Sequence, residues 1–165
     1  TAALAARLDV SEAALYRHFP SKYMMYQGLI DFIEQTVFGL INKISMEEQD
    51  GLRQVEGILA LLLGFAQKNR GMTRVLIGDA LVNEDERLQQ RINQLLDRIE
   101  ATLKQSLRIA ATQGKLAADT DFGAHANLLL CYVAGRWQQF GKSGYVRDPM
   151  AQWPQQWAIL SHQLA

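Results

Sequence analysis

Residues 11–22 read SEAALYRHFPSK, and this segment carries the clearest indication of fold in the sequence. Ser11 can cap a helix through its hydroxyl, and Pro20 stops that helix after a few turns. Residues 1–8 have the composition of another short helix, and residues 9–10 make a brief break between the two. Two short helices joined by a tight turn indicate a helix-turn-helix.

The residue types around this turn suit contacts with DNA. In a helix-turn-helix, the second helix puts its first side chains into the major groove, which is about 12 Å wide, while hydroxyls and cations around it hold phosphates. Small alanines allow close approach to base edges and thymine methyl groups. The candidate DNA-binding residues are Thr1, Ser11, Glu12, Ala13, Ala14, Tyr16, His18 and Lys22. The alternative is a structural helical hairpin, with Leu15 and Phe19 in its core and the polar residues as caps.

The remainder of the sequence favours an all-α fold. It is 48% hydrophobic with only 3 prolines, and its apolar residues recur at helical spacing. A long helix is expected from Lys22, and further helices over residues 52–69, 73–81, 83–113, 120–140 and 149–164. Asn83 and Thr120 are the expected caps of two of them, and Gly71 the expected end of the helix over 52–69.

Two local patterns refine these boundaries. Ser45 and Glu48 have the spacing of a capping box, with Asp50 and Gly51 as a connection before the next helix. Pro154 predicts that the last helix either kinks or begins only at residue 153.

Composition excludes several classes of function. The 17 basic and 17 acidic side chains cancel, so attraction for phosphate must be local. A lone Cys131, expected as a small core residue, fits a reducing cytosol, and the longest apolar stretch, residues 58–66, is too short to cross a membrane. The 3 histidines lie far apart, and no catalytic set can be assembled. We therefore expect a cytoplasmic protein that is not an enzyme and uses no metal or cofactor.

The motif residues Leu4-Ala5, Asp9-Val10-Ser11, Leu15-Tyr16-Arg17-His18-Phe19 and Ser21-Lys22 resemble the DNA-binding domain of TetR-type regulators. The resemblance implies a DNA-binding domain and the start of a long connecting helix over residues 1–45, and a larger helical regulatory and dimerisation domain over residues 46–165. It also implies a further helix before Thr1, which this chain lacks, so the numbering is expected to start inside the natural protein.

The body resembles a narrower branch of these proteins, the nucleoid occlusion factors, through segments such as LLLGF at residues 61–65. The resemblance implies a nucleoid-associated homodimer that binds palindromic chromosomal sites, captures the C-terminal tail of the division protein FtsZ and inhibits division-ring assembly over the nucleoid. The implied tail-binding residues are Phe32, Leu61, Gly64, Lys68 and Asn69. The alternative is that Phe32 and Leu61 pack against each other. The sequence departs from the branch where Leu40 and Lys68 replace arginines and Arg70 replaces a common proline.

The C-terminal helices are rich in aromatic residues. By resemblance, they form a four-helix bundle with a second subunit, which sets two recognition helices about 34 Å apart. The implied dimer-interface residues are Trp137, Phe140, Trp153 and Trp157, and the alternative places them inside one chain.

A different function, a repressor that responds to a small molecule, remains open. Its ligand would occupy a cavity lined by Leu62, Phe65, Ile99, Leu129 and Trp137, which can equally well fill that space. A closed apolar cavity favours the repressor, and an open groove beside Phe32 favours partner binding.

Overall fold

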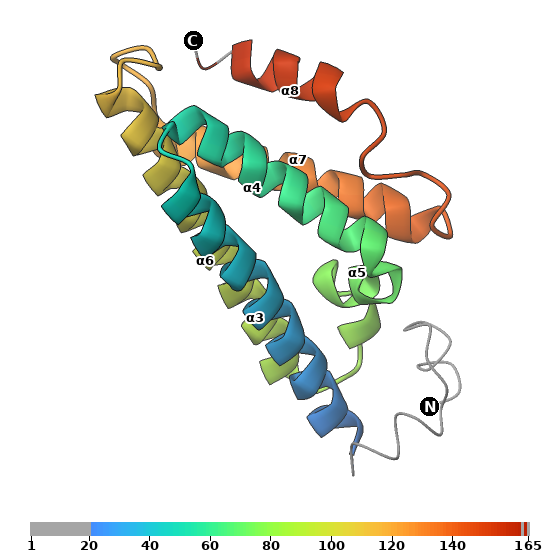
Figure 1. Ribbon diagram of the computed structural model, residues 1–165. Coiled ribbons are helices and arrows are strands. Elements are labelled where there is room, and N and C mark those ends of the chain that lie inside the picture. Colours follow the sequence, from blue (N-terminus) through green and yellow to red (C-terminus); the bar gives the residue numbers. More distant parts are fainter. Residues whose placement is uncertain (1–20, 163, 165) are drawn as a thin grey trace.

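The computed structural model describes residues 21–162 and residue 164, and all regular structure in this part of the chain is helical. The elements are α3 (Lys22–Glu47), α4 (Gly51–Lys68), α5 (Arg70–Leu76), the 3-10 helix η1 (Asp79–Leu81), α6 (Glu86–Thr112), α7 (Phe122–Lys142) and α8 (Trp153–His162) (Figure 1). The expected all-α class is confirmed. The segment 1–20, with the candidate residues Thr1, Ser11, Glu12, Ala13, Ala14, Tyr16 and His18, lies outside the described residues.

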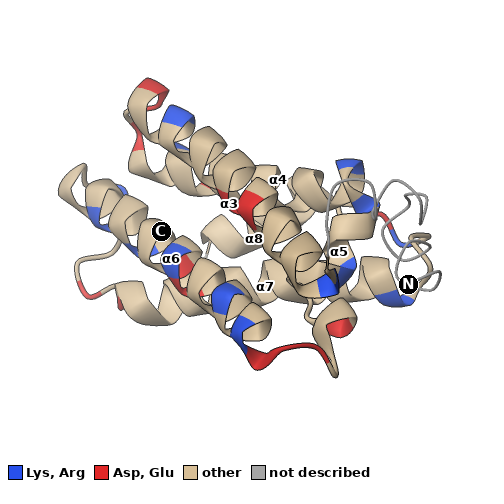
Figure 2. Cartoon of the chain, turned by 90° about the horizontal axis from the view of Figure 1, so that it is seen from below, with Lys and Arg blue, Asp and Glu red and all other residues tan. Residues whose placement is uncertain are grey.

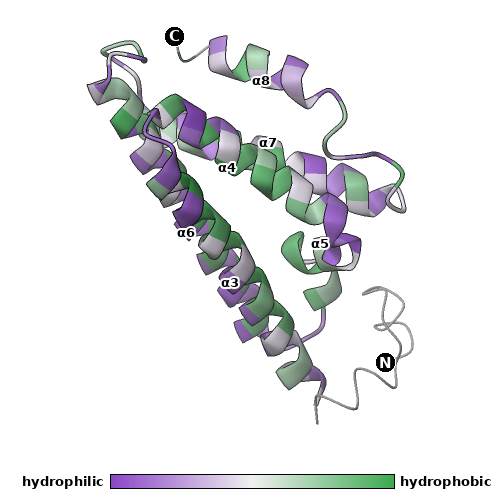
Figure 3. Cartoon of the chain, viewed as in Figure 1, coloured by the Kyte–Doolittle hydropathy of each residue, from purple (hydrophilic) through white to green (hydrophobic). Residues whose placement is uncertain are grey.

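Two long helices, α3 and α6, lie side by side, and α4 and α7 complete the body against them (Figure 1). Hydrophobic and hydrophilic residues alternate along the helices (Figure 3), and the buried residues of α3, α4 and α6 are mostly hydrophobic. The helical spacing of apolar residues is confirmed on α3, where Met25, Ile33, Val37 and Ile41 form a buried stripe. The stripe on α6 is confirmed in the same way by Leu88, Ile92, Leu95, Ile99, Leu103 and Leu107. Burial of these stripes is what holds the helices together.

The connection between α3 and α4 differs from the expected one. Ser45 lies inside α3, so the capping box predicted from Ser45 and Glu48 is wrong. Asp50 caps α4 instead, since its carboxylate accepts hydrogen bonds from the N–H groups of Leu52 and Arg53 at 2.9 and 3.1 Å. The hydrogen bond from Arg53, with Lys115 close by, lowers the pKa of Asp50. The carboxylate therefore stays ionised, and so caps this helix start, to a lower pH than an isolated aspartate does.

Gly51 is the first residue of α4 rather than part of a connection. A methyl group added at Gly51 would lie 2.3 Å from the backbone nitrogen of Ala110 and 2.5 Å from the carbonyl oxygen of Ser106. Its own N–H donates to the side chain of Gln113 at 2.9 Å. Gly51 is therefore the point at which the start of α4 meets the backbone of α6.

Two other predicted caps are displaced by a neighbouring aspartate. The cap of α6 is Asp85 rather than Asn83, whose φ of 68° places it in a turn. The cap of α7 is Asp121 rather than Thr120, and its carboxylate accepts from the N–H of Ala124 at 3.0 Å. Both types of residue cap helices, and only the path of the chain decides which one is used.

The helices that follow α4 are shorter than the sequence predicted. Gly71 lies within α5 instead of ending the preceding helix, and the expected helix over 73–81 is divided into α5 and η1. The division falls at Gly78, whose φ of 81° is in the left-handed region that favours glycine. The last helix begins at Trp153, which confirms the delayed start that Pro154 predicted.

No helix in the described ranges is long and apolar enough to cross a membrane. Cys131 is exposed on α7, so its placement in the core was wrong.

Candidate functional site

An open groove of about 210 Å³ lies between α3 and α4. Its lining residues are Thr36, Leu40, Ala60, Leu61, Gly64, Phe65, Lys68 and Asn69. The groove thus brings together Leu61, Gly64, Lys68 and Asn69, which the sequence selected as a set. Phe32 lies one helical turn before Thr36, and its ring is 6.4 Å from the ring of Phe65.

Helical spacing explains how these side chains come to share one surface. Phe32, Thr36 and Leu40 are four residues apart on α3, and therefore lie on one face of that helix. Phe32 and Leu40 are 45% and 42% exposed, although α3 packs its opposite stripe into the core. The Phe32 ring pairs with Phe65 and remains open to solvent. Thr36, Leu40, Ala60 and Phe65 were not selected from the sequence as groove residues, although the four-residue spacing after Phe32 pointed to Thr36 and Leu40.

Gly64 and Lys68 line this groove, although neither the packing nor the ion pairs of the described residues require them there. A methyl group added at Gly64 would meet no heavy atom within 4 Å, so no packing contact within the described residues requires glycine there. Lys68 is exposed and forms no ion pair with any described side chain. The amide nitrogen of Asn69 donates to the carbonyl oxygen of Phe65 at 3.0 Å, which orients that amide at the end of α4. An apolar floor with a cation at its rim suits an extended peptide with apolar and acidic side chains.

The start of α3 forms a second region of interest because Lys22, a candidate DNA-binding residue, is its first residue. Ser21 caps this helix and accepts a hydrogen bond from the N–H of Met24 at 3.1 Å. The ammonium nitrogen of Lys22 lies 2.8 Å from a carboxylate oxygen of Glu84. Sequence analysis did not identify Glu84 as this partner, because the two residues are brought together only by the packing of α3 on the connection before α6.

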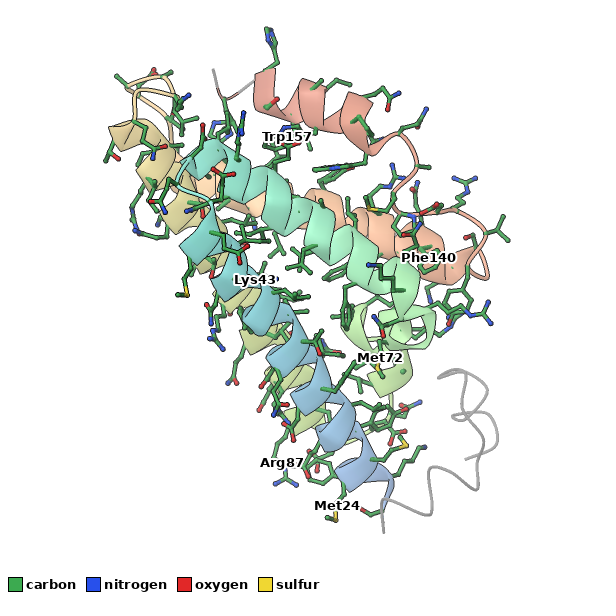
Figure 4. All side chains as sticks on the ribbon, in the orientation of Figure 1. Met24, Lys43, Met72, Arg87, Phe140 and Trp157 are labelled. Carbon is green, nitrogen blue, oxygen red and sulfur yellow. The ribbon has the colours of Figure 1, made fainter. Side chains whose placement is uncertain are left out.

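Further contacts fix the first turns of α3 to the same connection. The hydroxyl of Tyr26 donates to the carbonyl oxygen of Ala80 at 2.9 Å, and this bond is buried. The guanidinium of Arg87 lies 4.8 Å from the centre of the Tyr23 ring, and Figure 4 shows Arg87 at this end of α6. Arg87 also binds the carboxylate of Asp85 and lowers the pKa of that group to about 2. The start of α3 is therefore held firmly against η1 and the start of α6.

Three of the four aromatic residues predicted for the dimer interface are buried in the single chain, and Trp157 is half-buried. Trp137 is 1% exposed and donates from its indole nitrogen to the carbonyl oxygen of Leu62 at 2.9 Å, and Phe140 is 5% exposed. The structure therefore corrects the assignment of these two, which lie in the core of the single chain. Trp153 is also buried here and lies between Tyr132 and Trp157, with ring centres 6.2 and 5.8 Å away. Trp157 is on the side of α8 that faces the rest of the chain (Figure 4).

Other apolar residues of α7 and α8 face outward instead. Leu128, Cys131 and Gly135 lie on one exposed face of α7, and Leu128 is 55% exposed. Ile159 on α8 is 65% exposed. This surface was not predicted from the sequence, although residues 128–133 are apolar on all sides of the helix, a pattern that indicates cover on both faces.

The side chains considered for a small-molecule cavity fill the interior. Leu62, Ile99, Leu129 and Trp137 are each at most 2% exposed, and Phe65 is 5% exposed. The groove between α3 and α4 and the two surface pockets beside η1 are not lined by any of the first four. Phe65 alone of this set lines one of these pockets, and that pocket is the open groove.

Comparison with protein families assigns both parts of the chain. Residues 1–29 match the bacterial regulatory proteins of the tetR family, and residues 49–165 match the tetracyclin repressor-like, C-terminal domain of SlmA-like type. Lys22 therefore falls in the first match, and Gly64, Lys68 and Glu84 fall in the second. The DNA-binding character predicted from residues 11–22 and the TetR-like fold are confirmed by these matches.

Curated relatives match nearly the whole chain. The nucleoid occlusion factor SlmA of Alteromonas mediterranea is 51% identical over 158 residues, which are 96% of this chain and 81% of that protein. The proteins of the same name from Idiomarina loihiensis and a Marinomonas species are 48% and 46% identical over 99% of this chain, covering 84% and 83% of the relatives.

Solved structures show the same fold at much lower identity. The transcriptional regulator FadR of Bacillus subtilis, solved with stearoyl-CoA, has a TM-score of 0.70 at 13% identity and covers 98% of this chain and 86% of its own. A tetR-family regulatory protein from Rhodococcus has a TM-score of 0.69 at 17% identity, with 98% and 83% covered. The chain belongs to the TetR family of bacterial DNA-binding proteins, and within it to the group with an SlmA-like C-terminal domain.

Proposed function

We propose that this protein is a nucleoid occlusion factor that binds specific palindromic DNA sites as a homodimer and, in that state, binds the C-terminal tail of FtsZ and inhibits ring assembly over the nucleoid. It acts by binding and carries out no catalysis. The observation that carries the proposal is the open groove between α3 and α4, which unites Leu61, Gly64, Lys68 and Asn69 beside exposed Phe32. The names of the curated relatives support the same role.

The groove has what an acidic, partly apolar tail requires. Leu40, Leu61 and the Phe32–Phe65 pair supply apolar surface, and Lys68 supplies a cation that no described carboxylate neutralises. The open space at Gly64 admits a peptide backbone. Lys68 is a single point charge, so it supports one carboxylate contact without the two parallel hydrogen bonds of a guanidinium.

One titration tests this function directly. An FtsZ tail peptide is titrated into the natural full-length protein with and without a palindromic duplex that the protein selects from a random-sequence library. Binding that is strengthened by the duplex supports the proposal. Absence of peptide binding in both conditions, with intact DNA binding, would contradict it and favour a ligand-responsive repressor.

Lys22→Ala is expected to weaken DNA binding and reduce its salt dependence. The substitution removes one phosphate contact from each subunit, and at about 0.9 per contact the magnitude of the slope of log K against log salt concentration falls by about 1.8 for the dimer. The measurement is fluorescence anisotropy with the selected duplex over a range of salt concentrations. An unchanged slope and affinity would remove Lys22 from the DNA-binding surface. Lys43→Ala, a change to an exposed lysine on the same helix near its other end, is the matched control and should leave the slope unaltered.

Leu128→Arg is expected to weaken or abolish dimer formation without unfolding the chain. Leu128 is 55% exposed in the single chain, and the proposed second subunit covers it, so the substitution would bury an unpaired charge. Sedimentation equilibrium measures the change in dimer dissociation constant, expected to be at least about 30-fold for a central interface position. Val146→Arg, a change to an apolar residue that is 80% exposed in the loop after α7, serves as the control. A fully dimeric Leu128→Arg protein would place the dimer interface elsewhere.

A further inference from the structure

We propose that Glu84 sets the DNA affinity of this protein by competing with a DNA phosphate for the ammonium group of Lys22. The inference rests on the proposed role of Lys22 in phosphate binding. It assigns a function to a residue that lies in the C-terminal family match, outside the helix-turn-helix.

The geometry of the pair is asymmetric. Lys22 Nζ and Glu84 Oε2 are 2.8 Å apart, and the side chain of Lys22 is 45% exposed whereas that of Glu84 is only 17% exposed. The ammonium group therefore reaches solvent, where a phosphate can approach it. The carboxylate is mostly covered by the protein and cannot follow the ammonium group outward.

Among the described residues, no second cation is free to take over from Lys22 at Glu84. Arg87 is held by Asp85 at 2.8 Å, and Arg91 is held by Asp31 and Glu34 at 2.7 and 3.1 Å. When a phosphate draws Lys22 away, a mostly covered carboxylate loses its partner. A covered charge without a partner is unfavourable, so part of the energy of the phosphate contact is consumed at Glu84.

The acidic residues around the Lys22–Glu84 pair also disfavour DNA binding. Glu84, Asp85 and Glu86 form an acidic segment that leads into α6, drawn in red in Figure 2. Arg87 neutralises Asp85, so within the part of the chain that the structure describes the charge of Glu84 is balanced by Lys22. As a phosphate approaches Lys22, Glu84 and the phosphate are like charges close to the same ammonium group, and they repel each other. Glu84 therefore lowers both the affinity and the association rate.

The test replaces the carboxylate by its uncharged isostere. Glu84→Gln in the natural full-length protein is expected to bind the selected duplex about threefold more tightly, the scale of a partly exposed ion pair, with most of the gain in the association rate. Glu84→Ala removes the same charge and is expected to give the same direction of change. Glu86→Gln is the matched control, because Glu86 is exposed, lies in the same acidic segment and forms no ion pair with Lys22.

The decisive comparison is a double-mutant cycle. In a Lys22→Ala background, Glu84→Gln is expected to give a much smaller gain in DNA affinity, because the competition for the ammonium group is gone and only the repulsion between Glu84 and the phosphate remains. The inference is overturned if Glu84→Gln leaves the affinity unchanged or weakens it, if its gain is equally large without Lys22, or if Glu86→Gln gives an equal gain. Wild-type protein that binds no duplex would overturn the proposed function itself, a result distinct from all of these.

Discussion

Gly51→Ala is expected to lower the free energy of unfolding by about 3 kcal/mol, the upper part of the range for overpacking a well-packed contact. The added methyl group would lie 2.3 Å from the Ala110 nitrogen and 2.5 Å from the Ser106 carbonyl oxygen, and both are backbone atoms that cannot rotate away. The start of α4 must then separate from α6. Separation also breaks the 2.9 Å hydrogen bond between Ser106 and Gln54, which is buried.

Gly57→Ala is the matched control for this prediction. Gly57 lies in the same helix, and a methyl group there would be 3.5 Å from the side chain of Ile44, an ordinary van der Waals distance. Alanine is the better helix former, so Gly57→Ala is expected to raise stability by about 0.5–1 kcal/mol. Urea unfolding followed by circular dichroism measures both variants. Equal effects of the two substitutions would show that the contact between α4 and α6 is not tight at Gly51.

Phe32→Ala is expected to weaken binding of the FtsZ tail by about 30-fold, the effect of truncating an aromatic hot-spot residue. Phe32 is 45% exposed and pairs with Phe65 at the groove, so it presents aromatic surface to a bound peptide. Isothermal titration of the tail peptide into the DNA-bound protein gives the dissociation constant. The same substitution should leave DNA binding unaltered, because the groove lies away from Lys22.

Met46→Ala controls for the loss of an exposed apolar side chain. Met46 is 79% exposed, lies on the same helix as Phe32 and does not line the groove. Its substitution should change peptide affinity less than about twofold, since surface residues away from an interface contribute little. If Phe32→Ala behaves like Met46→Ala, the tail binds elsewhere. If both variants lose binding, the effect is on the helix rather than on the groove.

The sequence predicted most of the helices but few of their ends. Periodic apolar stripes on α3 and α6 identify the buried faces because a helix repeats every 3.6 residues. Caps were less predictable, as Asn83 and Asp85 show, because both residues satisfy free N–H groups equally well. Which of the two residues caps the helix depends on where the connection must turn.

The candidate site, like the helices, was predicted from the sequence only in part. Five residues were selected from the sequence by resemblance, and four of them line one groove. The five are Phe32 on α3, Leu61, Gly64 and Lys68 on α4, and Asn69 at its C-terminal cap. Thr36 and Leu40 were within reach of the sequence, because they continue the four-residue spacing of Phe32. The burial of Trp137 could not be predicted from the sequence, because an aromatic residue on an apolar helix fits the core of one chain as well as an interface.

The sequence by itself determined that this protein is helical, that residues 11–22 have the character of a DNA-reading motif and that its family is the TetR family. Those properties depend on patterns among residues that are close together in the sequence, so they can be recognised without the three-dimensional structure. Only the tertiary structure decided that Lys22 meets Glu84, that Gly51 touches the backbone of α6 and that Leu128 rather than Trp137 faces outward. Each of these depends on contacts between residues far apart in the chain, and such contacts are set by how whole helices pack against one another.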